Sequence, residues 1–213
     1  MIIPVTLGML MAAGILSWVG TAAVRRWLLA RQILDQPNAR SSHHTPVPRG
    51  GGVAVIAVII VMLLLETTYG TLTKEFAVIL SAIFIVAGIS FWDDLRGLPA
   101  WARLLSHIAA VGAGIFTLPD QGIFQGLLPE RLDHMAAAVL WVWFINLYNF
   151  MDGIDGLAAL ETIAISLGLV IVSILAGTGV DLWPVIIAGA AIGFLIWNFP
   201  PAKIFLGDVG SVA

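Results

Sequence analysis

The sequence predicts an all-α membrane protein, a polytopic bundle of about seven transmembrane helices. Three observations support this fold class. The chain of 213 residues is 60% hydrophobic and only 11% charged, whereas a soluble domain usually has about 25% charged residues. Long apolar stretches recur between short polar clusters, and backbone groups in hydrocarbon must pair within their own segment, which favours helices. The stretches also lack the period-two alternation of a membrane β-barrel.

Seven uncharged apolar stretches define the expected spans. They are Ile2–Val24, Gly50–Leu65, Phe76–Trp92, Leu104–Leu118, Met135–Met151, Thr162–Val180 and Leu182–Ala202. A span needs roughly 20 residues, so we expect flanking residues to extend the shorter stretches. The first stretch exceeds a signal-peptide core of about 7–15 residues, so we expect it to be retained. No internal repeat is evident, and we expect one membrane domain over residues 1–213.

Basic residues are distributed unevenly between the two sets of loops. Lys74 and Arg131 lie on one side, and the other eight basic residues lie on the opposite side. Because positive loops stay in the cytoplasm, we expect the N-terminus outside and the C-terminus inside. The cytoplasmic loops would then carry Asp93, Asp94, Asp152, Asp155 and Asp208.

Composition excludes several classes of site. The chain has no cysteine, which excludes disulfides, a thiol nucleophile and a cysteine-ligated metal. Its net charge is only −3 and it has no long basic run, so we expect no nucleic-acid partner.

Two adjacent carboxylates, Asp93 and Asp94, end the third apolar stretch. Ionisable groups at a lipid boundary are costly and tend to be functional. The pair could bind a divalent cation, or one carboxylate could act as a general base. A solvated helix end with Arg96 as neighbour is the alternative that this motif alone leaves open.

A row of four polar residues spaced three apart ends the fifth stretch: Asn146, Asn149, Asp152 and Asp155. Residues three apart on a helix are neighbours, so the row predicts a polar stripe on one side of a helix. Interhelical hydrogen bonds would explain one or two of the asparagines. They do not explain all four residues, so the row favours a functional site.

Gly207 and Gly210 bracket Asp208 directly after the last stretch. This pattern predicts a tight turn that presents the carboxylate beside backbone N–H groups, and such a turn can hold a phosphate–metal pair. An ordinary glycine-rich loop would show the same pattern.

The loop between the first two stretches is basic and rich in hydrogen-bond donors, from Arg40-Ser-Ser-His43 to Pro48-Arg49-Gly-Gly-Gly52. Its arginines can each bind a phosphate through two parallel hydrogen bonds. A topology signal alone would explain the arginines but not the serines, histidines and glycines. A histidine pair is a poor site for Mg²⁺, which prefers oxygen ligands.

Together these motifs place five carboxylates, two asparagines and a basic loop at one membrane face. Carboxylates beside arginines are typical of a site that holds Mg²⁺ and a diphosphate. This site would open both to the cytosol and to lipid. The pattern therefore predicts transfer of a phosphate-linked group from a soluble donor to a lipid acceptor.

The motifs and their order resemble the polyprenyl-phosphate N-acetylhexosamine-1-phosphate transferases of glycosyl transferase family 4. The resemblance rests on the paired carboxylates, the row 146–157 and the segment 205–211, and loop 40–52 resembles the subgroup that initiates bacterial O-antigen or other surface polysaccharides. The family implies that a UDP-N-acetylhexosamine and undecaprenyl phosphate give undecaprenyl-diphospho-sugar and UMP, with Mg²⁺ or alternatively Mn²⁺. It also implies an enzyme of the bacterial inner membrane, active on the cytoplasmic face, with a homodimer as one assembly.

The resemblance implies roles for individual residues. Asp208 would be a Mg²⁺ ligand, with Asn149 as a second. Asp93 would be the base that activates the lipid phosphate, supported by Asp94, and Asp152 and Asp155 would line the nucleotide pocket. The residues expected to bind substrate are Asn146, Asp152, Asp155, Arg40, His43 and Arg49.

The chain departs from the family pattern at its end. Family members usually have further spans and a later cytoplasmic loop that helps to hold the donor, whereas this chain stops two residues after Ser211. We therefore expect the N-terminal two-thirds of a larger transferase.

Three alternatives remain from the residues themselves. An ion-coupled transporter would place its polar groups near the bilayer midplane, and here they lie at the ends of apolar stretches. A CDP-alcohol phosphotransferase would have an arginine soon after its first Asp-Gly, which the segment from Asp152 to Ala158 lacks. A catalytically incomplete assembly subunit is the third alternative.

Overall fold

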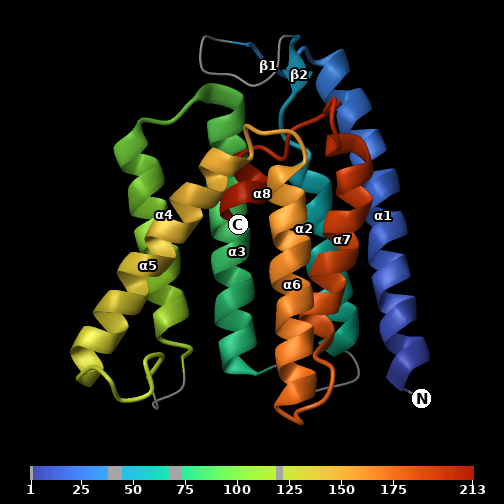
Figure 1. The fold of residues 1–213 in the computed structure, drawn as a ribbon. Helices are drawn as coiled ribbons and strands as arrows, with labels where there is room; N and C mark the ends of the chain where they lie inside the picture. Colours follow the sequence, from blue (N-terminus) through green and yellow to red (C-terminus); the bar gives the residue numbers. More distant parts are fainter. Residues whose placement is uncertain (1, 38–44, 68–72, 119–121) are drawn as a thin grey trace.

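The protein folds into a bundle of helices that run back and forth between two ends (Figure 1). The computed structural model describes residues 2–37, 45–67, 73–118 and 122–213. Their elements are α1 (Ile2–Ala30), β1 (Leu34–Asp35), β2 (Val47–Pro48), α2 (Gly52–Thr67), α3 (Lys74–Arg96), α4 (Ala100–Ile115), α5 (Glu130–Met151), α6 (Leu157–Leu175), α7 (Leu182–Asn198) and α8 (Asp208–Val212).

The lengths and composition of the helices confirm the predicted all-α membrane bundle. Four helices, α1, α3, α5 and α6, are long and apolar enough to cross a membrane, and α2, α4 and α7 are shorter apolar helices. Each overlaps one of the seven predicted stretches. Large apolar side chains such as Phe150 and Leu175 are exposed on the bundle surface, an arrangement that suits lipid better than water. The number of complete crossings and the orientation stay predictions.

Glycines bring α1 and α7 into close contact. A Cβ atom added at Gly193 would lie 2.1 Å from the carbonyl oxygen of Gly14, and one at Gly189 would lie 2.4 Å from that of Leu10. Gly189 and Gly193 lie four residues apart on α7, and small residues at this spacing let helices in lipid pack backbone to backbone. The buried Phe194 beside them joins the core between α1, α2, α6 and α7.

The connections at one end of the bundle bring distant segments together. β1 pairs antiparallel with β2, and Leu34 lies opposite Pro48. The chain then pairs with the segment before α8: the Gly51 amide donates to the Phe205 carbonyl at 2.9 Å, and the Gly52 amide donates to the Leu206 carbonyl at 2.7 Å. This pairing fixes the start of α2 beside the start of α8.

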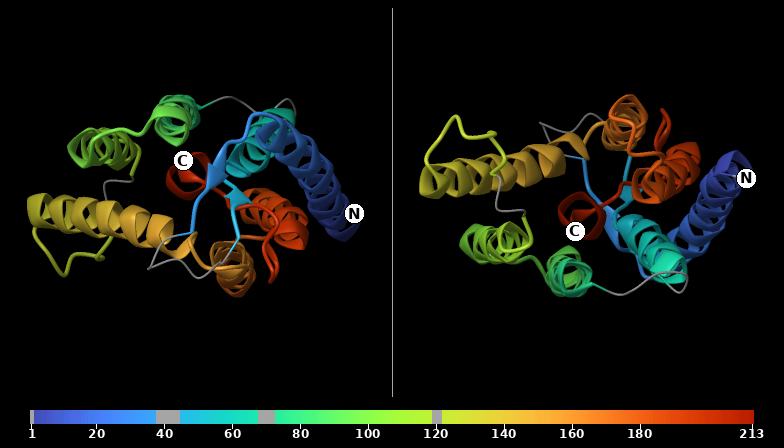
Figure 2. Two further views of the ribbon diagram at one scale, coloured as in Figure 1. Left: turned by 90° about the horizontal axis from the view of Figure 1, so that it is seen from above. Right: turned by 90° about the horizontal axis from the view of Figure 1, so that it is seen from below.

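The short helix α8 lies in the middle of the bundle, against α2, α3 and α5 (Figure 2). It approaches α2 so closely that a Cβ atom at Gly52 would lie 2.3 Å from the Cα atom of Gly210. Gly207, just before α8, has a φ of 75°, a conformation that favours glycine. Close approach at this end therefore depends on glycine on both sides of the contact.

We expect Gly193→Ala to destabilise the protein by about 1–3 kcal/mol, because the added methyl group overpacks the α1–α7 contact. Thermal unfolding in detergent, followed by far-ultraviolet circular dichroism, would measure the change. Gly168→Ala in α6 is the matched control, since no atom lies within 4 Å of its added Cβ. Equal melting temperatures for the two variants would contradict this account of the contact.

Candidate active site

Carboxylates from three distant segments meet where α3 ends and α8 begins. Asp93 and Asp94 occupy the end of α3, Asp152 follows α5, and Asp208 is the first residue of α8. Asp93, Asp152 and Asp208 are buried, and the side chain of Asp94 is 4% exposed. The structure thus brings together four of the residues expected from sequence, while their chemical roles stay predictions.

Two arginines pair with these carboxylates. Arg49, which precedes α2, contacts Asp208 through a terminal nitrogen and lies 3.2 Å from Asp94 through its Nε. Arg103, near the start of α4, lies 3.4 Å from Asp93 and 3.6 Å from Asp208. Their side chains are 38% and 39% exposed, so an incoming anion can reach both. Asp208 joins the two ion pairs into one cluster.

Arg103 was not among the residues that we predicted to bind substrate. Its position follows from the short connection between α3 and α4, where the Leu98 amide donates to the Asp93 side chain. A tight connection places the first turn of one helix beside the last turn of the preceding one. The ten-residue separation from Asp93 to Arg103, across a Gly-Leu-Pro turn, is the sequence signal that could have identified it.

Two of the carboxylates bind the backbone that leads into α8. Asp152 accepts hydrogen bonds from the amides of Leu206 and Gly207, at 3.0 and 2.7 Å. Asp94 accepts from the amides of Asp208 and Val209, at 3.1 and 3.4 Å. The two side chains therefore orient Asp208 toward the arginines.

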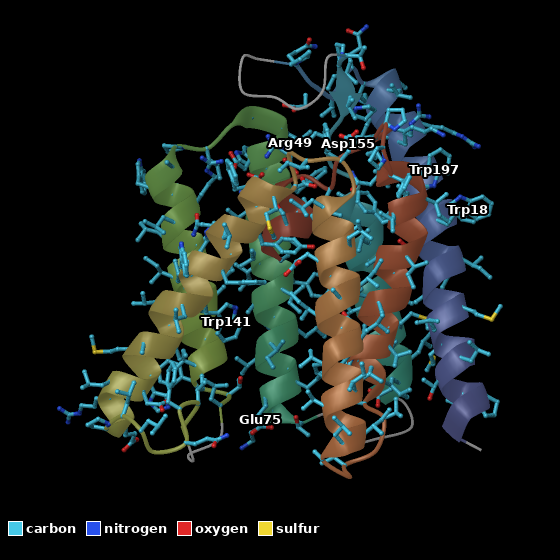
Figure 3. The ribbon with its side chains drawn as sticks, in the orientation of Figure 1. Trp18, Arg49, Glu75, Trp141, Asp155 and Trp197 are labelled. Carbon is cyan, nitrogen blue, oxygen red and sulfur yellow. The ribbon has the colours of Figure 1, made fainter. Side chains whose placement is uncertain are left out.

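The connection from α5 to α6 is held by polar contacts with the segment after α7. Asp155 accepts a hydrogen bond from the Ala202 amide at 2.9 Å. The buried Asn198 accepts from the Gly156 amide and donates to the Ile204 carbonyl, both at 3.0 Å. Figure 3 shows Asp155 and Arg49 at the same end of the bundle. Asn198 was missed from sequence because it lies within an apolar stretch.

The predicted polar stripe is not one continuous helix face, which corrects that expectation. α5 ends at Met151, and the chain turns before α6, with Gly156 at a φ of 76°. Asn149 accepts a hydrogen bond from the Ser211 hydroxyl at 2.9 Å, which ties it to α8. Asn146 is exposed and donates to the Val142 carbonyl of its own helix.

Two predicted residues of the basic loop, Arg40 and His43, lie outside the described residues. Their expected contacts with phosphate or sugar stay predictions. Arg49, from the same loop, is described and lies in the carboxylate cluster.

The pKa values of the cluster reflect its excess of carboxyl groups. Burial raises the pKa of Asp152 to about 7, although its two amide hydrogen bonds oppose the shift. Burial and a hydrogen bond with Asp93 raise the pKa of Asp208 to about 6. Burial alone would lower the pKa of Arg49, but the charges of Asp208 and Asp94 raise it. Four carboxyl groups face two guanidinium groups, so a further cation would stabilise the ionised cluster.

The donor set suits Mg²⁺ in chemistry, because all the donors are oxygens. Within the described ranges, no three acidic or histidine side chains form a metal site by themselves. Mg²⁺ commonly uses only one or two carboxylates and takes waters and substrate phosphates as its other ligands. Asp208 begins α8, and Asn149 binds Ser211 of the same short helix. Both predicted ligands therefore belong to one region, and the metal stays a prediction.

We expect Asp152→Asn to lower the free energy of unfolding by about 2 kcal/mol, because one buried amide of the Leu206–Gly207 pair loses its acceptor. Thermal unfolding at pH 8 would measure the loss. Asp155→Asn should cost less, since a single oxygen of Asp155 has a hydrogen bond in the described structure and the asparagine carbonyl can keep it. An equal or larger loss in Asp155→Asn would contradict the role assigned to Asp152.

Comparison with known proteins identifies the family. The profile of the family described as glycosyl transferase family 4 matches residues 76–213. The decaprenyl-phosphate N-acetylglucosaminephosphotransferase of Mycobacterium tuberculosis is 32% identical, over 95% of this chain and 56% of its own length. The probable undecaprenyl-phosphate N-acetylglucosaminyl 1-phosphate transferase of Bacillus subtilis is 32% identical, over 90% and 55%.

A third relative is the phospho-N-acetylmuramoyl-pentapeptide-transferase of Lactiplantibacillus plantarum, which is 31% identical over 77% of this chain and 56% of its own length. The chain thus spans a little over half the length of these relatives. The profile match covers about two-thirds of the chain and includes the α3 carboxylates, the turn after α5 and Asp208. The chain therefore belongs to glycosyl transferase family 4, and its relatives are polyprenyl-phosphate N-acetylhexosamine-1-phosphate transferases.

Proposed function

We propose that this chain forms the carboxylate-bearing part of an enzyme that transfers N-acetylhexosamine 1-phosphate from a UDP-sugar to undecaprenyl phosphate. The observation that carries the proposal is the convergence of Asp93, Asp94 and Asp208 on two arginines at one end of an apolar bundle. Two of the relatives are named for a polyprenyl phosphate and for N-acetylglucosamine, which makes N-acetylglucosamine the first sugar to test. Initiation of an O-antigen stays a prediction from the loop 40–52.

One apolar cavity borders the cluster, and a second lies beside α8, as a lipid acceptor requires. A cavity of about 400 Å³ is lined by Trp27, Leu28 and Leu95 and reaches Arg49 and Asp94. A second, of about 450 Å³, lies between α2, α3, α5, α6 and α7 and reaches Ser211 of α8. A phosphate bound at the arginines could thus be joined to a chain that stays in an apolar environment.

The proposed step is a displacement at phosphorus. An oxygen of undecaprenyl phosphate bonds to the phosphorus that carries the sugar, the bridging P–O bond breaks, and UMP leaves with the bridging oxygen. Arg49 and Arg103 would bind the phosphate oxygens and reduce repulsion between the two anions. Asp93, held by the Leu98 amide and Arg103, would take a proton from an acceptor phosphate that arrives protonated. Direct attack needs fewer assumptions than a covalent aspartyl intermediate, which is the alternative.

Asp208 and Asn149 would hold Mg²⁺. When bound, the metal would offset the charge that develops on the diphosphate. Asp152 and Asp94 would act on this site through the backbone amides that they bind, as positioning residues.

A transporter is less well supported. The charged cluster involves the last turn of α3, the first turn of α4 and the residue after α5, whereas a coupling-ion site would lie near the middle of the helices. An assembly subunit without activity stays the alternative for a chain that spans about half of its relatives.

We further propose that the carboxylate end faces the bacterial cytoplasm. Among the described basic residues, Lys74 and Arg131 lie at the opposite end, at the starts of α3 and α5. The carboxylate end has Arg25, Arg26, Arg31, Arg49, Arg96, Arg103 and Lys203. This asymmetry supports the positive-inside orientation predicted from sequence.

Because the chain has no cysteine, single cysteines can test the orientation. We expect Glu130→Cys, at the start of α5, to react with a membrane-impermeant thiol reagent in cells whose inner membrane is intact. Gln36→Cys, beside β1, should react only after the membrane is opened. The reverse pattern would place the carboxylate end outside and would refute a cytoplasmic donor.

The transferase proposal predicts UMP release that requires undecaprenyl phosphate and is abolished by a chelator and restored by Mg²⁺. We expect Asp208→Asn and Asp93→Asn each to lower the rate by several orders of magnitude, because grouped catalytic residues act together. The assay uses both this chain and a version extended to the length of its relatives, with UDP-N-acetylglucosamine as donor.

Asp181→Asn is the matched control. Asp181 caps α7 at the other end of the bundle, and asparagine caps helices about as well as aspartate. Full turnover by the extended chain carrying Asp208→Asn would refute the proposal. Activity in the extended chain but not in the 213-residue chain would show that this part of the protein needs the remainder.

A further inference from the structure

Cations and tryptophans gather on the outer face of α1 and α7. The guanidinium carbon of Arg25 lies 5.7 Å from the ring centroid of Trp197, and the ammonium nitrogen of Lys203 lies 5.8 Å from the same centroid. Trp18 lies next to Trp197 on this side of the bundle (Figure 3). α2 and α7 lie between α1 and α8 (Figures 1 and 2), and the cavity that reaches Arg49 and Asp94 is lined by other residues of α1, such as Trp27 and Leu28.

Hydrogen bonds to the backbone fix this cluster. The indole nitrogen of Trp197 donates to the Trp18 carbonyl at 3.0 Å. The Lys203 amide donates to the Trp197 carbonyl at 2.8 Å. Arg25 donates through Nε to the Lys203 carbonyl at 3.0 Å, which leaves its two terminal nitrogens for another acceptor. These bonds hold the guanidinium of Arg25 and the indole of Trp197, together with the backbone from which the Lys203 side chain extends.

The charge of the cluster is not neutralised. In the part of the chain that the structure describes, the ion pairs between arginines and carboxylates involve Arg49 and Arg103, and none involves Arg25 or Lys203. Arg26, the next residue of α1, is exposed and also carries a positive charge. One carboxylate lies close by, because Asp155 accepts a hydrogen bond from the Ala202 amide beside Lys203. The cations still outnumber it, so this surface can bind a further anion.

An apolar groove continues from the cluster along the contact between α1 and α7. It has a volume of about 250 Å³, and the residues that line it include Met11, Gly14, Ile15, Trp18, Ile192 and Ile196. The groove lies at the glycine contact, because Gly14 and Gly193 have no side chains to fill the surface there. Trp18 belongs to both features, because it lines the groove while its carbonyl binds Trp197.

We propose that this face binds an anionic phospholipid of the bilayer, with its phosphate at Arg25 and Lys203 and one acyl chain in the groove. From Leu10 to Trp18 the groove covers roughly 12 Å of helix, close to the roughly 15 Å of one leaflet's hydrocarbon. Tryptophans prefer the headgroup level, which is where Trp18 and Trp197 would place the phosphate. A polyprenyl chain is much longer than this groove, and the face lies apart from the carboxylate cluster. The site thus stands independently of the transferase proposal.

Native mass spectrometry of the chain in a neutral detergent would test the site by titration with phosphatidylglycerol and with phosphatidylcholine of the same acyl chains. We expect the first phosphatidylglycerol to bind roughly thirtyfold more tightly than phosphatidylcholine, at about fivefold for each of the two cations. Arg25→Gln with Lys203→Gln should weaken phosphatidylglycerol binding roughly thirtyfold, at about fivefold per lost charge, and leave phosphatidylcholine binding unchanged.

Two further variants keep the test independent of folding. Lys203→Gln alone leaves the Arg25 hydrogen bond, which uses a backbone carbonyl, and should weaken binding roughly fivefold. Lys74→Gln with Arg131→Gln removes the same charge at the opposite end and should retain wild-type affinity. Circular dichroism checks that each variant keeps its helical content.

Four outcomes would overturn the proposal. They are equal affinity for the two lipids, equal losses in the two double variants, tighter binding of undecaprenyl phosphate through the same two cations, and a dimer that excludes phosphatidylglycerol. The third outcome would assign the face to the carrier lipid, and the fourth would assign it to a second copy of the chain.

Discussion

Four consecutive amides, from Leu206 to Val209, donate to two carboxylates, and the candidate site depends on this contact. Asp152 accepts from the first two amides and Asp94 from the last two. Hydrogen bonds to a charged acceptor are stronger than neutral ones, and buried amides without acceptors would be costly. The contact joins the ends of α3 and α5 to the start of α8, so the positions of these three helix ends depend on one another.

The four-amide contact determines which carboxylate side chains are free to face the arginines. With its backbone held by Asp94, Asp208 turns its side chain to Arg49 and Arg103. The carbonyls of Phe205 and Leu206 accept hydrogen bonds from the glycines at the start of α2, which brings the basic loop to the carboxylates. The acidic residues therefore differ in their contacts. Asp152 binds backbone amides, Asp208 pairs with arginines, and Asp93 and Asp94 do both, a distinction that residue type alone does not reveal.

The sequence predicted the helices better than the contacts between them. Apolar stretches located all seven long helices because hydrocarbon leaves the backbone few other conformations, and the motifs pointed to Asp93, Asp94 and Asp208. Arg103 was treated only as a topology signal, since its partner depends on the turn between α3 and α4. Asn198 was hidden in an apolar stretch. The row from Asn146 to Asp155 was predicted as one helix face because spacing alone does not show that Met151 ends α5.

The order in which the chain is made gives the four-amide contact a consequence for biosynthesis. Asp93, Asp94 and Asp152 enter the membrane region well before residues 206–209 leave the ribosome. During this interval the carboxyl groups of Asp94 and Asp152 lack the backbone amides that they bind in the folded protein. Protonated or water-exposed carboxyl groups would be the cheapest interim state. α8 would then dock against the ends of α3 and α5 after both helices have been inserted, and a pause in translation near residue 200 would leave an inserted but open intermediate for quality control to detect.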